Sequence, residues 1–249
     1  MTVLLYFIIG FAAQMIDGAL GMAYGVTSRT LLQSVAKVPP VTASAIVHFS
    51  EIPATCVSGF SHIRYKNYNL KLLYKLAIPG VIGGAAGAFF LSSYGETLEP
   101  FVCAYLIVMG VRIVAEGFSR QDTRFGLSGK LVVYPIAFAG GFLDAVGGGG
   151  WGPVLVSSLL AKGEDNKKII GSVNISEFFV TAFEAMVFVA TLGNLSSYLK
   201  TVGCLVAGNV VAAPIAAKLC LGINEKFLFL LVGGLIIALN VYNFIGYVM

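Results

Sequence analysis

Long apolar segments separated by short polar loops cover most of the chain. Six of these segments have the length of single helical spans: 41–61, 72–92, 98–116, 168–192, 197–220 and 226–248. A helix rises about 1.5 Å per residue, so roughly 20 residues cross the ~30 Å hydrocarbon core of a bilayer. The pattern therefore predicts an all-α integral membrane protein.

Two further apolar segments, 3–36 and 131–161, contain an internal break. Residues 143–153 read Leu-Asp-Ala-Val-Gly-Gly-Gly-Gly-Trp-Gly-Pro, and 16–25 form a weaker copy, Ile-Asp-Gly-Ala-Leu-Gly-Met-Ala-Tyr-Gly. Relative to Ala, Gly costs about 1 kcal/mol and Pro about 3 kcal/mol inside a helix. Backbone groups freed by a break in lipid must find protein or water. Each segment therefore predicts a broken, re-entrant unit that lines a cavity.

The second half of the chain repeats the plan of the first. Offsets of 126 or 127 residues align the polar positions: Asp17 with Asp144, His48 with Asn174, Ser50 with Ser176, and Glu51 with Glu177. Transporters are often built from two such repeats. We expect a first repeat at 1–118, a cytoplasmic linker at 119–130 and a second repeat at 131–249, each a broken unit followed by three transmembrane helices.

The basic residues indicate how the two repeats are oriented. With re-entrant broken units, 13 of the 16 Lys and Arg residues fall on one side of the membrane and 3 on the other. If each broken unit crosses once, the division becomes 8 against 6, with Arg29 and Lys200 hard to assign. Because short cytoplasmic loops are enriched in Lys and Arg, the first arrangement is favoured. It predicts inverted repeats with both termini outside.

Composition narrows the class of protein further. The chain is 57% hydrophobic and 11% charged, with a mean hydropathy of +0.88, whereas soluble domains carry about 25% charged residues. The net charge of +4 sets topology and does not suggest nucleic acid as a partner. The four cysteines and two histidines show no metal-ligand spacing, so we expect neither a cofactor nor a metal. A base–nucleophile–orienter trio is also missing, which argues against an enzyme.

Carboxylates inside apolar segments are the first candidates for function. A charged, unpaired carboxylate costs roughly 2.5–3.5 kcal/mol at the centre of a span. Asp17 and Asp144 adjoin the breaks, where a carboxyl either caps a half-helix or takes part in coupling. Glu51 and Glu177 stand beside serines in mid-span, where a carboxyl could bind a proton or cation and couple it to substrate movement. Glu184 is a fifth such residue, without a counterpart in the repeat.

The glycine runs are the stronger signal. A half-helix that starts at the run would direct free backbone N–H groups and its positive dipole end at the cavity, which suits an anion. The candidate residues are Gly147, Gly148, Gly149 and Gly150, with Gly18 and Gly21 in the first repeat. The alternative is close helix packing, which we favour for Gly83–Ala88.

Other polar residues could contribute to substrate binding. His48 and Asn174, with Ser50 and Ser176 nearby, could donate hydrogen bonds to an oxyanion, or His48 could be a satisfied helix–helix contact. Arg29 has no counterpart in the second repeat. It lies either near the outer surface or inside the protein, where it would be a fixed cation that attracts an anion.

Three stretches of this chain resemble the sulfite exporter TauE/SafE family of membrane proteins. They are Gly10–Gly21, Pro39–Glu51 and Gly140–Pro153. The resemblance covers both repeats and implies an integral membrane transporter of small sulfur-containing anions, such as sulfite or organosulfonates, usually out of the cytoplasm. One departure is that the first repeat has Gly18-Ala19-Leu20-Gly21 and Val26 where the second has four consecutive glycines and Pro153. The first break is therefore expected to be the softer one.

The leading hypothesis is a secondary transporter in the cytoplasmic membrane that exports a small oxyanion, with proton coupling through the buried carboxyls. A cation or proton channel or transporter using the same carboxylates is the main alternative. A membrane enzyme or a structural assembly partner is the third. The expected partners are a small anionic substrate and the lipid bilayer, not nucleic acid, and homo-oligomer formation is left open.

Overall fold

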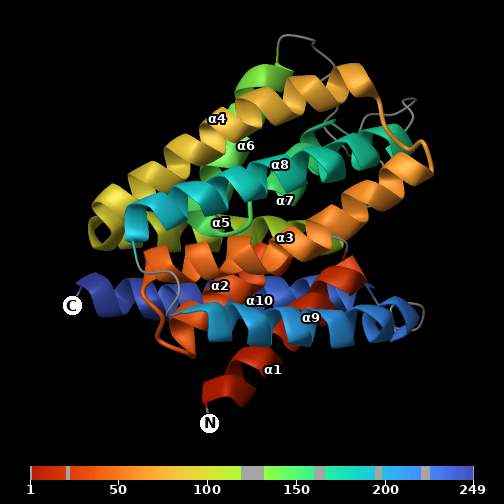
Figure 1. Ribbon diagram of the computed structural model, residues 1–249. Coiled ribbons are helices and arrows are strands. Elements are labelled where there is room, and N and C mark those ends of the chain that lie inside the picture. Colours follow the sequence, from red (N-terminus) through yellow and green to blue (C-terminus); the bar gives the residue numbers. More distant parts are fainter. Residues whose placement is uncertain are drawn as a thin grey trace. The chain divides into compact units, whose positions relative to one another are not determined.

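A computed structural model describes residues 2–20, 23–118, 132–159, 166–193, 198–219 and 225–248 of the chain. In these ranges the regular secondary structure is helical and contains no strand, as Figure 1 shows. The prediction of an all-α fold is therefore confirmed. The predicted cytoplasmic linker at 119–130 lies outside the described residues.

Each half of the chain contains the two helices of a broken segment followed by three longer helices. The first half contains α1 (Thr2–Leu20), α2 (Tyr24–Ser34), α3 (Pro40–Arg64), α4 (Leu70–Tyr94), a 3-10 turn η1 (Gly95–Leu98) and α5 (Glu99–Phe118). The second half contains α6 (Val133–Gly147), α7 (Trp151–Leu159), α8 (Asn166–Leu192), α9 (Leu199–Leu219) and α10 (Glu225–Val248). Each segment expected to be broken is thus two helices.

Five of the long helices, but not α3, have the length and composition of membrane spans. Within the described residues, α4, α5, α8, α9 and α10 contain stretches with mean hydropathies of 1.6 to 2.2. Large apolar side chains lie on their outer surfaces, such as Phe101, which is 72% exposed. Such exposure is unfavourable in water but natural against lipid. The chain is a multi-pass membrane protein.

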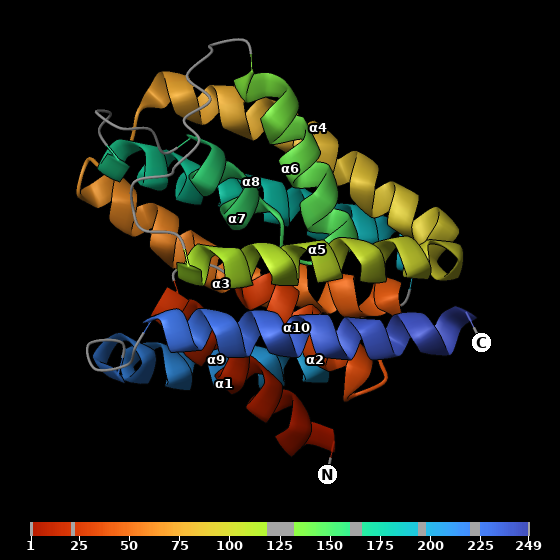
Figure 2. The same cartoon turned by 180° about the vertical axis from the view of Figure 1, so that it is seen from behind.

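The helices form two compact units that do not coincide with the two halves of the sequence. Unit 1 contains residues 1–47, 94–120 and 195–249, and unit 2 contains residues 48–93 and 121–194. Within unit 1, α1 lies along α9 and α5 lies along α10, as Figures 1 and 2 show. Each unit therefore combines helices from both halves.

Glycines bring the helices of each unit into close contact. In unit 1, a Cβ at Gly10 of α1 would clash with the carbonyl oxygen of Leu205 in α9. In unit 2, a Cβ at Gly83 or Gly87 of α4 would clash with a backbone carbonyl of α6. The first helix of each broken pair thus packs tightly on the second long helix of the other half, because small residues let backbones approach.

In unit 2, the corresponding helices α3 and α8 run antiparallel. His48 of α3 lies beside Glu184 of α8, with 3.1 Å between Nδ1 and Oε2, and Ser58 donates a 2.9 Å hydrogen bond to Asn174 Oδ1. At the offset of 126, His48 corresponds to Asn174 and Ser58 corresponds to Glu184, so the two contacts are related by the repeat. Antiparallel corresponding helices are what inverted repeats require, whereas repeats related by an axis along the membrane normal would make them parallel. The inverted orientation of the complete halves stays a prediction.

Candidate functional site

The helix break in unit 2 is made by Gly148. It follows α6 with φ 71° and ψ 19°, in the left-handed region, and its N–H donates to the carbonyl of Asp144 at 2.6 Å. Glycine reaches this conformation without the penalty that a Cβ brings. Residues 148–150 separate the two helices, and α7 begins at Trp151.

The carboxylate of Asp144 caps the N-terminus of α7. Its Oδ1 accepts hydrogen bonds from the backbone N–H of Gly150 at 2.5 Å and of Trp151 at 3.0 Å. Pro153 has no N–H, so it adds no donor to this first turn. The backbone N–H groups at the start of α7 are a favourable position for an anion. The side chain of Asp144 occupies this position.

The first break, in unit 1, has the same plan. Asp17 Oδ1 accepts a 3.1 Å hydrogen bond from the backbone N–H of Tyr24, the first residue of α2. Asp17 and Tyr24 correspond to Asp144 and Trp151 at the offset of 127. Gly18 falls within α1, and Gly21 lies outside the described residues. Residues 21 and 22 of the first break lie outside the described residues, so the expectation of a softer first break stays a prediction.

A cluster of buried acidic and imidazole groups adjoins the second break. His48, Asp144 and Glu184 each offer one ligand atom, and these atoms lie within 4.8 Å of one another. The exposed fractions of these residues are 0%, 4% and 0%. The His48 ring stacks on Phe188, with 5.9 Å between the ring centroids. Three different helices, α3, α6 and α8, therefore bring titratable groups together.

Two further contacts define this cluster. Glu51 Oε2 lies 3.6 Å from His48 Nδ1, and its side chain is 15% exposed, so it is the least buried carboxyl of the group. On the other side, a Cβ at Gly84 of α4 would clash with the Glu184 carboxyl. Gly84 therefore provides the space for Glu184, whereas Gly83 and Gly87 bring α4 onto α6.

The donor set of the cluster has two chemical uses. One imidazole nitrogen and two carboxylates are ligands that Zn²⁺ and Mn²⁺ accept, although the spacing of residues in the sequence did not suggest a metal. Carboxyls and an imidazole packed together in a water-poor interior also bind and exchange protons. We favour proton exchange, because Glu51, the least buried residue of the group, is a carboxyl.

Glu184 belongs to the cluster but was not among the site residues predicted from the sequence. Its counterpart at an offset of 126 is Ser58, so the comparison of repeats did not select it. A helical signal was present, because Glu177, Thr181 and Glu184 are spaced at i, i+4 and i+7 and share one face of α8. Thr181 and Glu184 are fully buried.

The remaining polar candidates of unit 2 have local partners. Asn174 Nδ2 donates to the carbonyl of Ile170 at 3.0 Å, and Ser176 Oγ donates to the carbonyl of Val173 at 2.8 Å. Ser50 is buried, and Glu177 is half-buried. His48 and Asn174 have different partners, Glu184 and Ser58. A role of these four residues in substrate binding or coupling stays a prediction.

Trp151 anchors α7 in the core of unit 2. The indole is fully buried, and its Nε1–H donates to the carbonyl of Val173 at 3.1 Å. A Cβ at Gly80 would clash with the indole ring, so α4 has a glycine where the ring packs. This large buried side chain fixes the start of α7 relative to Asp144.

The half-helix of unit 1 differs because its polar residues are buried. Arg29 is fully buried in the middle of α2, so the interpretation of this residue as a surface group is wrong. Its Nη2 donates to the carbonyl of Pro40 at 3.5 Å. Neighbouring polar contacts join α2 to α5 and α10: Gln33 to Glu99, Thr30 to Asn240, and Ser34 to Asn243.

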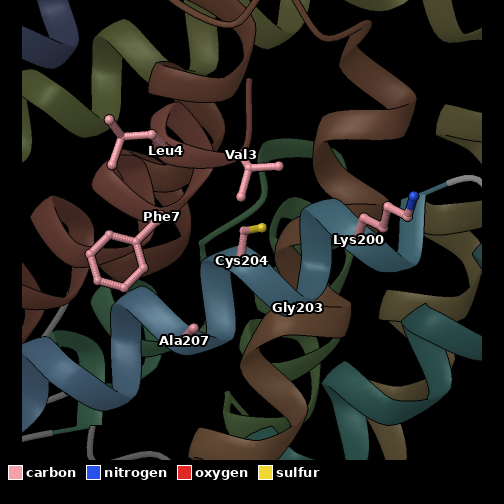
Figure 3. A pocket seen from close by; sticks show the side chains of 7 residues that line it. All are labelled: Val3, Leu4, Phe7, Lys200, Gly203, Cys204 and Ala207. Carbon is pink, nitrogen blue, oxygen red and sulfur yellow. The ribbon is translucent and has the colours of Figure 1, made fainter. Parts of the chain in front are cut away.

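A groove on unit 1 lies apart from these polar groups. It has a volume of about 660 Å³ and is lined by Val3, Leu4 and Phe7 of α1 and by Lys200, Gly203, Cys204 and Ala207 of α9, as Figure 3 shows. Its walls are apolar except for the amine of Lys200. None of the predicted site residues lines it.

Paired broken helices and buried carboxylates in a multi-pass helical protein define the class of membrane transporters. The chain belongs to the sulfite exporter TauE/SafE family, whose model matches residues 6–243. It is similar to "Probable membrane transporter protein YtnM" of Bacillus subtilis (strain 168), with 38% identity over 244 residues that cover 96% of this chain and 81% of that protein. No solved structure matches the chain. The resemblance to this family is therefore confirmed.

Proposed function

We propose that this protein works by secondary transport. It would move a small sulfur-containing oxyanion, such as sulfite or an organosulfonate, out of the cytoplasm across the cytoplasmic membrane. The family description supports the class of substrate. The observation that carries the proposal is the hydrogen bonding of Asp144 to the amides of Gly150 and Trp151. A carboxylate is itself an oxyanion, so these amides have the geometry that oxygen anions require.

Substrate binding is proposed for the groups around the two breaks. In unit 2 these are Gly147, Gly148, Gly149 and Gly150, with His48, Ser50, Asn174 and Ser176. In unit 1 they are Gly18, Gly21 and Arg29. The full burial of Arg29 supports a role as a fixed positive charge, because a guanidinium held away from water attracts an anion more strongly than an exposed one.

Proton coupling is proposed for Glu51, Glu177, Asp17 and Asp144. The contact of Glu51 with His48 and the burial of Asp144 beside Glu184 support it, because such groups change protonation state readily when their surroundings change. The activity is transport, and we assign no bond-breaking step to any of these residues.

A cation or proton transporter is the second candidate. It is favoured by one observation, that Glu51, Asp144 and Glu184 gather around His48 in unit 2. A cluster of several carboxylates attracts cations, and Asp144 already balances the positive end of α7. In this alternative the carboxylates bind the transported ion itself.

Flux in proteoliposomes distinguishes the two candidates. Vesicles that contain the purified protein are loaded with labelled sulfite or a labelled small sulfonate, with and without an imposed pH gradient. Saturable efflux that unlabelled sulfite inhibits supports the oxyanion transporter. Efflux absent for both anions, together with proton or cation movement in the same vesicles, supports the alternative. Vesicles without protein give the background leak.

A further inference from the structure

We propose that Asp144 is an internal anion that occupies the amides of α7 until it binds a proton, and that His48 and Glu184 share this proton. The substrate anion would then take the amides as the proton binds. The protein would thus take up one proton each time it binds an anion. This inference rests on the proposed function and adds a mechanism of coupling and a site residue, Glu184, to it.

Asp144 and the substrate anion compete for the same two donors. Asp144 Oδ1 holds the N–H groups of Gly150 and Trp151, which are the free donors at the start of α7. A charged carboxylate accepts such hydrogen bonds much more strongly than a neutral carboxyl does. Protonation of Asp144 therefore weakens the cap and makes the positive end of α7 available to another oxyanion.

His48 and Glu184 lie close enough to Asp144 to supply its proton. The ligand atoms of Asp144, Glu184 and His48 lie within 4.8 Å of one another, in residues that are at least nine-tenths buried. His48 Nδ1 lies 3.1 Å from Glu184 Oε2, and the Glu184 carboxyl shares a side-chain hydrogen bond with Asp144. Two carboxylates this close in a low-dielectric interior cannot both stay ionised without a proton or a cation.

Carboxyls outnumber basic groups around the cluster. Glu51 and His48 come from α3, Asp144 from α6 and Glu184 from α8, while the neighbouring residue of α4 is Gly84. The sequence of α7, Trp151–Leu159, contains no charged residue. Negative groups thus outnumber positive ones, which favours proton uptake. The 15% exposure of Glu51 makes it the point of entry for the proton.

Thermodynamic linkage relates the affinity for the anion to the affinity for the proton. If the anion prefers the form with Asp144 protonated, then a bound anion raises the affinity for the proton by the same factor. A dianion that moves with one proton carries a net charge of −1. A membrane potential that is negative inside drives such a complex outward, by about 2.3 kcal/mol per 100 mV. Proton uptake with the anion is therefore compatible with export.

The protein contains its own probe of this site. Trp151 is the single tryptophan of the chain, and its backbone N–H lies 3.0 Å from Asp144 Oδ1. Trp151 fluorescence is measured during a pH titration of the purified protein in detergent, first without substrate and then with sodium sulfite. We expect one transition without substrate. Sulfite should move its midpoint to higher pH, by about one pH unit per tenfold increase above the dissociation constant.

Three variants test the assignment. Asp144→Asn should abolish the transition, because the amide retains an acceptor oxygen but cannot titrate. Glu184→Gln should shift the midpoint, because it removes the group that shares the proton. Gly234→Ala, at a position where a Cβ meets open space, should leave the transition of Trp151 unchanged. Circular dichroism and gel filtration check that each variant is folded.

Several results would overturn the inference. It fails if folded Asp144→Asn and folded Glu184→Gln keep the wild-type transition, or if sulfite moves the midpoint to lower pH. It also fails if Zn²⁺ abolishes the transition of the chelator-treated protein at micromolar concentration, because the cluster would then be a metal site. If sulfite drives saturable flux but leaves the midpoint unchanged, only the coupling mechanism is wrong. If sulfite neither moves in vesicles nor shifts the midpoint, the proposed substrate is wrong and the coupling to it falls too.

Discussion

The half-helices α2 and α7 begin in the same way and differ in almost everything that follows. In each, the backbone N–H of the first residue donates to an aspartate seven residues earlier in the chain. α7 continues with apolar residues and packs on Leu76, Val173 and Val180. α2 instead buries Thr27, Ser28, Arg29, Thr30, Gln33 and Ser34. The shared part is therefore the cap.

This difference suggests a division of labour between the two breaks. In unit 1 a guanidinium that keeps its charge at every physiological pH lies in a half-helix rich in hydroxyl and amide groups, near the carboxyl of Glu99, which is hydrogen-bonded to Gln33. In unit 2 an imidazole and two carboxyls, those of His48, Asp144 and Glu184, come together near the break. A duplicated scaffold can thus supply a permanent charge in one unit and a proton-dependent charge in the other.

The largest expected effect is at the break itself. Gly148→Leu places a side chain at φ 71°, where the backbone strain of about 1–2 kcal/mol adds to the steric block of a buried position. We expect sulfite binding, measured by Trp151 fluorescence, to weaken by roughly a hundredfold. Gly234→Ala is the control, because a Cβ there has open space. Normal affinity in Gly148→Leu would mean that the glycines serve packing alone.

The second prediction tests the permanent charge of unit 1. Arg29→Gln removes the buried guanidinium, and we expect sulfite affinity to fall by about tenfold or more, since one fixed charge inside a protein contributes at least ~1.4 kcal/mol to an anion. Arg29→Lys, which keeps the charge, should retain part of the affinity. The measurement is binding at a constant pH. Equal loss in both variants would indicate that Arg29 only supports the fold of α2.

The sequence predicted the helical class and the second break because both depend on local properties. Apolar length determines a span, and Gly148 is in a run that no helix tolerates well. Capping of a half-helix was one of the two interpretations of Asp144 from the sequence, and the structure shows this cap. The contact between His48 and Glu184 was not predictable in this way, because it joins helices 136 residues apart and has no counterpart of the same chemistry in the repeat. The burial of Arg29 likewise depends on α5 and α10, which pack on α2.

The third prediction compares two carboxyls that the repeat makes equivalent. Glu51 contacts His48 at 3.6 Å, whereas Glu177 lies on α8, two turns from Glu184. Glu51→Gln should reduce flux driven by a pH gradient by about tenfold, and Glu177→Gln by a few-fold, with folding unaffected in both. The measurement is efflux of labelled sulfite at several external pH values. A flux whose pH dependence is unchanged in both variants would remove these glutamates from coupling.

The smallest effect concerns the backbone at the two breaks. Ala23, which precedes α2, has φ 109°, a conformation that costs a residue with a Cβ about 1 kcal/mol, whereas unit 2 has glycine in the left-handed position at Gly148. Ala23→Gly should therefore stabilise the protein slightly, and Gly148→Ala should destabilise it by about 1 kcal/mol. Thermal unfolding in detergent, followed by circular dichroism, measures both changes. Shifts of the same sign in the two variants would show that backbone strain is not what distinguishes the breaks, and that the side chains packed around them decide their stability.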